Sequence, residues 1–122
     1  MGTQIKYHLT ERQSKIAEIL PESDRITGPE DILDILADVG YNKCNRIIIY
    51  DKNLNPDFFN LKTRVAGEIL QKFSNYRMRL AVVGDFAGYK SKSLRDFIWE
   101  SNKMGMVFFV SSIEEALSKL NK

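Results

Sequence analysis

The sequence predicts an α/β domain with a mostly parallel, mixed β-sheet that begins with an antiparallel hairpin, in the order β-β-α-β-α-β-α-β-α. Three observations support this prediction. Two short β-rich runs lie close together near the N-terminus, three further strand-like runs follow, and amphipathic segments of helical period come after each of those three and before the first of them. Strands that alternate with helices are typical of a parallel sheet with helices packed against it.

The N-terminal part is expected to form the hairpin and the first helix. Residues 4–9 and 15–20 are β-rich, and the polar residues 10–14 between them favour a turn. Thr27 and Glu30 have the spacing of a capping box, so we expect them to open a helix that Gly40 ends. Its apolar face is Ile32, Leu33, Ile35, Leu36 and Val39.

The middle of the chain predicts a central strand followed by the longest helix. Residues 47–49 are three consecutive isoleucines, which is typical of a strand buried on both faces, so we place 46–50 in the middle of the sheet. Asn55 and Pro56 are a helix-start signal, and we expect one helix from there to about Tyr76. Its apolar residues recur at three or four positions: Phe58, Leu61, Val65, Ile69 and Phe73.

The last third predicts two more strands and two more helices. Residues 79–83 and 106–110 are the strands, and Gly84 closes the first of them. Ser93 is expected to cap the third helix, and Ser112 with Glu115 forms a capping box for the closing helix. The inward residues expected on the third helix are Leu94, Phe97, Ile98, Ser101 and Met104, and those on the closing helix are Ile113, Ala116, Leu117 and Leu120.

Length and composition narrow the class of protein. A chain of 122 residues with 43% apolar and 28% charged residues fits one globular domain over residues 1–122. The formal net charge of +2 is spread along the chain, so we expect no nucleic-acid partner. No apolar run has the length of a signal peptide or a membrane span, so we expect a cytoplasmic protein with no membrane partner.

The cysteine and histidine content gives little support for a metal or cofactor. Cys44 is the only cysteine, which excludes an internal disulfide and a multi-cysteine zinc site. His8 is the only histidine and is expected to be an ordinary strand residue. We therefore expect no cofactor, no metal and no named catalytic residue.

Two resemblances follow from the order of elements and from particular stretches. The order is similar to that of the STAS domains, the fold of the anti-sigma-factor antagonists and of cytoplasmic modules of sulfate transporters. Residues 52–84 and 91–102 resemble an uncharacterised bacterial family, domain of unknown function 4180. The STAS resemblance implies a phosphorylatable serine near the start of the helix after the third strand; here that region reads Asn60-Leu61-Lys62-Thr63, so Thr63 is the candidate stand-in.

A weak ligand site is predicted where parallel strands end. Asp51 and Asp85 each follow a strand, at the edge where open parallel sheets usually bind ligands, and two carboxylates there would suit Mg²⁺. Ordinary turn residues are the alternative reading of both. Ser91 and Ser93, near a helix N-terminus, would suit an anion, although helix capping explains them more simply.

Two surfaces are candidates for binding a protein. Gly67 lies in an uncharged stripe opposite the apolar face of the long helix, and Trp99 lies away from the inward face of the third helix, with Arg95 one turn before it. The alternative for the stripe around Gly67 is an ordinary solvated face. The alternative for Trp99 is a side chain covered by a loop or by the next helix. We therefore predict a non-catalytic regulatory or protein-interaction domain with a protein partner or a homodimer. The alternative is a protein that binds a small molecule or phosphate metabolite. Such a protein could also be a Mg²⁺-dependent enzyme that uses the carboxylates at the strand ends.

Overall fold

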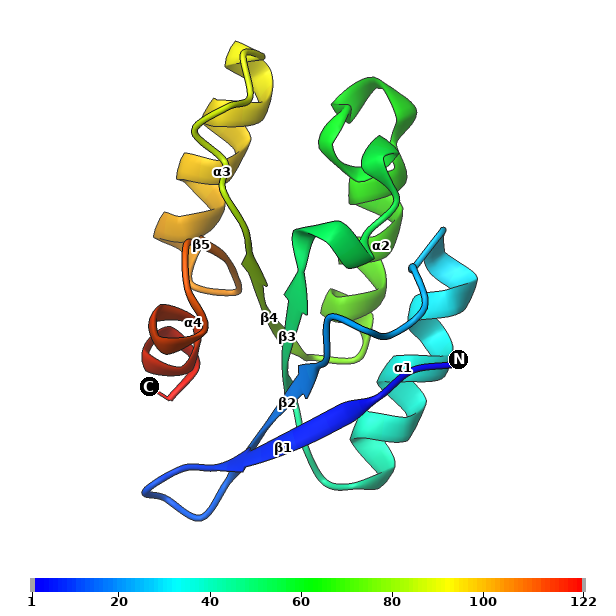
Figure 1. Ribbon diagram of the computed structural model, residues 1–122, viewed down its shortest axis with the longest axis vertical. Coiled ribbons are helices and arrows are strands. Elements are labelled where there is room, and N and C mark those ends of the chain that lie inside the picture. The colour runs from blue at the N-terminus through cyan, green and yellow to red at the C-terminus, as the bar shows by residue number, and fades with distance from the viewer. Residues whose placement is uncertain (1, 122) are drawn as a thin grey trace.

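The computed structural model describes residues 2–121 and contains a five-stranded sheet in the order β1-β2-β3-β4-β5 (Figure 1). The strands are β1 (Ile5–Leu9), β2 (Lys15–Ile19), β3 (Arg46–Tyr50), β4 (Arg79–Val83) and β5 (Val107–Val110). β1 pairs antiparallel with β2, and every other neighbouring pair is parallel. The predicted fold class, with its N-terminal hairpin and mixed sheet, is confirmed.

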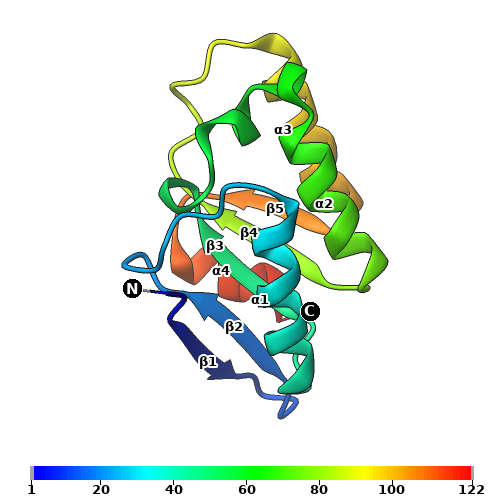
Figure 2. The ribbon, with the colours of Figure 1, turned by 90° about the vertical axis from the view of Figure 1, so that its right-hand side faces the viewer.

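The helices divide unequally between the two faces of the sheet. α1 (Pro29–Tyr41), α2 (Val65–Asn75) and α3 (Lys92–Met104) lie on one face, and α4 (Ile113–Leu120) lies on the other (Figure 2). Each of the first three connects neighbouring parallel strands in the same direction across the sheet, and right-handed crossovers then all fall on one side. Only α4, which follows the last strand, is free to cover the opposite face. No helix within residues 2–121 is long and apolar enough to cross a membrane.

The sheet consequently has an apolar core on both faces. Ile47 and Ile49 belong to the larger core under α1, α2 and α3, whereas Ile48 belongs to the smaller core under α4, and all three are fully buried. The prediction that this strand is central is therefore confirmed. The smaller core consists of Ile16, Ile48, Ala81, Val83, Phe108, Val110, Ala116 and Leu120.

The long helix expected from Asn55 to about Tyr76 is only half present. Its second half is α2, which ends at Asn75 as expected, but its first half is not α-helical. Three short 3₁₀ turns, η1 (Asp51–Asn53), η2 (Pro56–Phe59) and η3 (Leu61–Thr63), precede α2, and Arg64 has a left-handed backbone with φ 67°. The Asn55 and Asn60 side chains each accept a hydrogen bond from the backbone N–H two residues later. These local bonds compete with helical ones, so the segment forms turns in place of a helix.

The start and end of α1 differ from the prediction. The N-cap is Gly28, without a side-chain cap, and the Asp31 carboxylate instead accepts hydrogen bonds from the backbone and hydroxyl of Thr27 at 2.9 and 2.6 Å. The Thr27–Glu30 capping box is therefore wrong. Gly40 lies inside α1, which ends at Tyr41.

The N-cap of α3 differs from the prediction, whereas the N-cap of α4 agrees with it. Ser91, and not Ser93, is the N-cap of α3, and its hydroxyl accepts a hydrogen bond from the Leu94 backbone at 3.2 Å. Ser112 caps α4 as predicted. Met104, expected to face inward, is the last residue of α3 and is 77% exposed, so that prediction is wrong.

Candidate interaction site

The outer edge of β1 presents backbone groups that nothing within the described chain pairs. The backbone bonds Leu20 N–Gln4 O and Thr10 N–Ser14 O, both 2.8 Å, show that the even-numbered residues of β1 are the ones that bond to β2. In an antiparallel ladder the intervening residues point their N–H and C=O groups to the other side. Ile5, Tyr7 and Leu9 therefore present backbone donors and acceptors along an open edge, and no other element lies beyond it (Figure 2).

The opposite edge of the sheet, at β5, is partly closed by side chains of the same chain. The backbone N–H groups of Leu80 and Gly84 donate to the carbonyls of Met106 and Val110, which leaves Val107, Phe109 and Ser111 facing outward. The Asn102 side chain of α3 accepts a hydrogen bond from the Phe109 N–H at 2.7 Å and donates one to its carbonyl at 3.4 Å. The outward Ser111 N–H donates to the Glu115 carboxylate at 3.0 Å. Edge strands invite pairing with another chain, and side chains of this chain obstruct that pairing at Phe109 and Ser111 of the β5 edge, whereas no side chain within residues 2–121 does so at β1.

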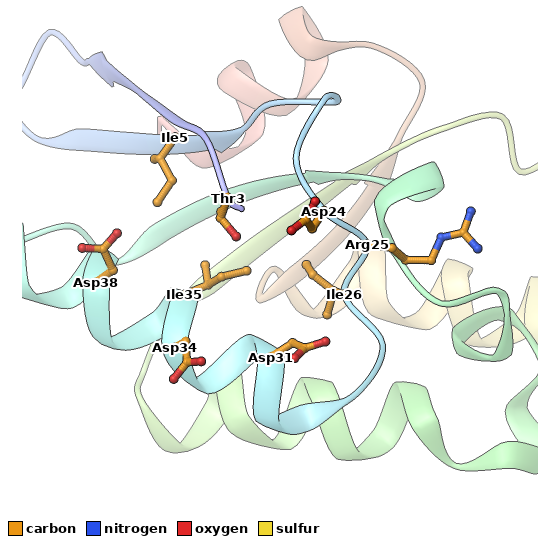
Figure 3. Close-up of a pocket in the computed structure, with 9 residues that line it drawn as sticks. All are labelled: Thr3, Ile5, Asp24, Arg25, Ile26, Asp31, Asp34, Ile35 and Asp38. Atoms are coloured by element: carbon orange, nitrogen blue, oxygen red, sulfur yellow. The ribbon is translucent and has the colours of Figure 1, made fainter. Parts of the chain in front are cut away.

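An acidic pocket of about 440 Å³ lies beside the open edge, on the face that carries α1 (Figure 3). Thr3 and Ile5 form its β1 wall, and Ile35 and the loop before α1 form part of the remainder. Its four carboxylates are Asp24, Asp31, Asp34 and Asp38, three of them from α1. The pocket therefore joins a strand edge to a row of negative charge.

Two of these carboxylates have no partner within residues 2–121. Asp31 is bound by Thr27, and the Asp24 carboxylate accepts a hydrogen bond from the Gly2 backbone at 2.8 Å. Asp34 and Asp38, four residues apart on one face of α1, make no such bond. Like charges at this spacing destabilise a helix slightly, so an opposite charge beside them would be stabilising.

The cations near the pocket form no ion pair with Asp34 or Asp38 within residues 2–121. Lys15 reaches the same side of the hairpin, where its ammonium donates to the Asn42 carbonyl at 3.2 Å and lies 5.6 Å from the centre of the Tyr7 ring. Arg25 lines the pocket, but Figure 3 shows its side chain extending away from the aspartates of α1. α1 contains no lysine or arginine. Burial, followed by the nearby Asp38 carboxylate, raises the pKa of Tyr7.

A buried carboxylate lies on the other face of the hairpin. Glu18 is 7% exposed, and it accepts hydrogen bonds from the Tyr50 hydroxyl at 2.6 Å and from the His8 ring at 2.8 Å. Burial and this carboxylate raise the pKa of Tyr50 well above its ordinary value. His8, expected to be an ordinary strand residue, thus belongs to a network that ties β1, β2 and β3 together.

The two strand-end aspartates are differently placed. The Asp51 carboxylate packs against the backbone of Gly84, and it lines a pocket of about 200 Å³ with Arg25 and Tyr89. Asp85 is exposed and not among the lining residues, and its carboxylate accepts a hydrogen bond from the Ala87 N–H at 3.2 Å, as a turn residue does. Residues 2–121 contain no group of three or more side chains suited to a metal.

The remaining ligand candidates are engaged in local structure. Ser91 caps α3, and Ser93 is an exposed residue of the first turn of that helix. Thr63, the candidate phospho-acceptor, is half-buried and donates its hydroxyl to the backbone carbonyls of Asp57 and Asn60 at 2.6 and 2.8 Å. A phosphate on Thr63 would require these bonds to break.

The candidate interface residues lie on two separate surfaces. Gly67 is exposed and lines a groove of about 670 Å³ with Leu61 and Phe97, and a Cβ added there would meet no atom within 4 Å. Trp99 is 60% exposed. The cation over its ring is Lys103, whose ammonium lies 4.1 Å from the ring centroid, and not Arg95 as the spacing suggested.

The fold and the site together define an α/β domain with three helices on one face, one on the other, and an open strand edge at β1 beside a row of carboxylates. The chain belongs to the family described as Domain of unknown function (DUF4180), whose match covers residues 11–120. That match includes every element from β2 to α4 and begins after β1. No curated protein and no solved structure is significantly similar to the chain.

Sequence reasoning did not identify the open edge or the acidic row. Two signals were present. A hairpin at the N-terminus of a parallel sheet leaves its first strand at an edge, and the stretch 29–41 carries four acidic residues and no basic one. Neither signal shows that the two features are neighbours, because that depends on the packing of α1 against the hairpin.

Proposed function

We propose that this domain is a non-catalytic interaction module that binds a protein partner by strand addition to the outer edge of β1. The difference between the two sheet edges carries the proposal. Asn102 and Glu115 occupy outward backbone groups at β5, whereas Ile5, Tyr7 and Leu9 keep theirs open. Strand addition uses these backbone groups for affinity and alternate side chains for specificity.

A second copy of the chain is a less suitable occupant than a different protein. Antiparallel pairing of two β1 strands about a two-fold axis would keep both α1 helices on the same side of the joined sheet. Each α1 carries Glu30, Asp31, Asp34 and Asp38 without a basic residue, so two rows of negative charge would face each other. We therefore place the homodimer second and a heterologous partner first.

The test of strand addition uses Leu9, whose N–H points away from β2 and whose side chain is 77% exposed. Proline removes the outward donor and is tolerated on an edge strand in this orientation. Leu9→Pro should keep the native circular dichroism spectrum. It should also lose binding of a short capped peptide that alternates threonine and valine. Leu9→Ala, which keeps the N–H, is the matched control and should retain binding.

Hydrogen exchange of the backbone amides locates the bound peptide. Binding should slow exchange at Ile5, Tyr7 and Leu9 and leave the amides of β5 unchanged. Equal binding to Leu9→Pro and Leu9→Ala would argue against strand addition. Light scattering provides the check on a homodimer, which would appear as a doubling of mass that Leu9→Pro abolishes.

A regulatory role is supported by the resemblance of the element order to the STAS domains, among them the anti-sigma-factor antagonists. Thr63 is the residue that would take the place of their phosphorylatable serine. Its hydroxyl is bound to two backbone carbonyls, so a regulatory phosphate would have to open the turns before α2. Incubation with ATP and a serine/threonine kinase, followed by mass spectrometry, should find a phosphate on Thr63 of the wild type and none at this position in Thr63→Val; an unmodified Thr63 in the wild type would argue against this role.

The second candidate function is binding of a small molecule or phosphate metabolite. The protein would then be either a Mg²⁺-dependent enzyme or a binding protein without catalytic activity. The pocket beside Asp51 favours it, because Arg25 and Lys52 place two cations next to that carboxylate at the ends of the parallel strands. A thermal-shift screen with nucleotides and divalent ions should raise the melting temperature of the wild type and not of Asp51→Asn. An unchanged melting temperature throughout would exclude a tight site of this kind.

A further inference from the structure

The face of the sheet that α1 covers is negatively charged beside the open edge of β1. Side chains of a strand alternate between the faces of a sheet, so an added strand would place every second side chain on the α1 side. Thr3 and Ile5 of this chain point to that side and line the acidic pocket. Neighbouring strands lie about 4.8 Å apart, so side chains of the added strand would be the immediate neighbours of these two.

The carboxylates of α1 lie within the same pocket and two of them lack partners. Asp34 and Asp38 extend from α1 into or beside the pocket, on the same helical face, and neither bonds to another side chain within the described residues. Asp31 adds a third carboxylate from α1, α1 contributes no basic residue, and Arg25 is turned away from the aspartates of α1, so this wall of the pocket is negative. An acidic or strictly apolar strand would leave these carboxylates unmatched, whereas a basic one would pair with them.

We propose that the open edge of β1 binds an extended segment of a partner protein in which lysine or arginine recurs at every second residue, and that these basic side chains lie over Asp34 and Asp38. The proposal rests on the proposed function, since it names the partner of the same edge. Backbone pairing to Ile5, Tyr7 and Leu9 supplies sequence-independent affinity, and the aspartates supply the preference for basic residues. Lysine and arginine also have long apolar stems that can cover Ile5 while the charge reaches the pocket.

The experiment compares three short capped peptides that alternate valine with lysine, threonine or glutamate. The lysine peptide should bind most tightly and the glutamate peptide least. The Asp34→Asn/Asp38→Asn double variant should weaken the lysine peptide about fivefold, the effect expected for two solvent-exposed charge pairs. The double variant should leave the threonine peptide unchanged. Binding of the lysine peptide should also weaken as salt is raised, because the pairs are exposed to solvent.

A matched control is Glu68→Gln/Glu100→Gln, which removes two exposed carboxylates from α2 and α3, away from the edge. This variant should bind all three peptides as the wild type does. Slowed amide exchange at Ile5, Tyr7 and Leu9 with the lysine peptide would place it on β1.

The outcomes separate this inference from the proposed function. Equal affinity for all three peptides, with slowed exchange at Ile5, Tyr7 and Leu9, would overturn the basic partner and leave strand addition standing. The basic partner would also be overturned if Asp34→Asn/Asp38→Asn and Glu68→Gln/Glu100→Gln preferred the lysine peptide to the same degree. The charge that selects lysine would then lie elsewhere. Absence of slowed exchange on β1 with every peptide would overturn strand addition and the basic partner together.

Discussion

Replacing Asn102 with alanine tests whether the β5 edge is closed by a side chain, as the asymmetry of the sheet requires. The variant loses the 2.7 Å bond from the Phe109 N–H and the longer one to its carbonyl. Phe109 is 5% exposed, so its N–H has limited access to replacement water, and the loss should cost about 1.5 kcal/mol. Alanine is the better helix former by about 0.5 kcal/mol, which leaves a net loss near 1 kcal/mol.

The melting temperature converts this free energy into a measurable shift. An unfolding entropy of about 2.1 cal/mol/K per residue predicts a fall of about 4 °C for this chain. Circular dichroism melts measure the shift, and amide exchange at Phe109 should accelerate. Glu100→Ala, at an exposed position of the same helix, is the control and should not lower the melting temperature. If Asn102→Ala melts as high as the control and exchange at Phe109 is unchanged, the side chain does not close the edge.

Three further predictions concern other parts of the molecule. Glu18→Ala should lower the free energy of unfolding in urea by about 2 kcal/mol or more, because Tyr50 and His8 lose their shared acceptor, whereas Glu18→Gln should cost less. The raised pKa of Tyr50 means that the folded state keeps its hydroxyl protonated where the unfolded chain has begun to release the proton. The contribution of Tyr50 to stability should therefore be fully present below about pH 10 and fall as the pH rises above it. Tyr50→Phe should remove this part of the loss of stability at alkaline pH when thermal melts are compared across pH. Arg64→Gly should raise the free energy of unfolding by about 0.5 to 1 kcal/mol, because Arg64 has a left-handed backbone that glycine adopts without strain; a lower stability in urea would contradict that reasoning.

Periodicity was sufficient to predict the strands and their succession along the chain. The isoleucines of β3 and the apolar run of β4 are buried on both faces, and such runs read as parallel strands without any tertiary information. The predicted ranges 46–50 and 79–83 agree with the observed strands. Helical ends were predicted less well, because several side chains compete for the same few backbone groups. Asp31 rather than Glu30 binds Thr27, and Ser91 rather than Ser93 caps α3.

The break before α2 shows the limit of periodicity. Phe58 and Leu61 have helical spacing from Val65, yet they lie in 3₁₀ turns that the Asn55 and Asn60 side chains stabilise. A spacing of three or four residues is compatible with both structures. Phe58 and Leu61 would contact the core in a continuous α-helix as well as in 3₁₀ turns, so their burial does not decide between the two structures.

What the amino-acid sequence determines by itself is the set of strands, their mostly parallel order and the position of the hairpin at the N-terminus, because these follow from local hydrophobic period and chain connectivity. Only the tertiary structure decides which backbone groups at the two edges remain open. That depends on Asn102 and Glu115 reaching the β5 edge, and on the lack of any side chain among residues 2–121 bonded to the outer groups of β1. It also decides that Asp34 and Asp38 lie beside that open edge, because α1 packs across the hairpin and brings residues far apart in the chain to one pocket.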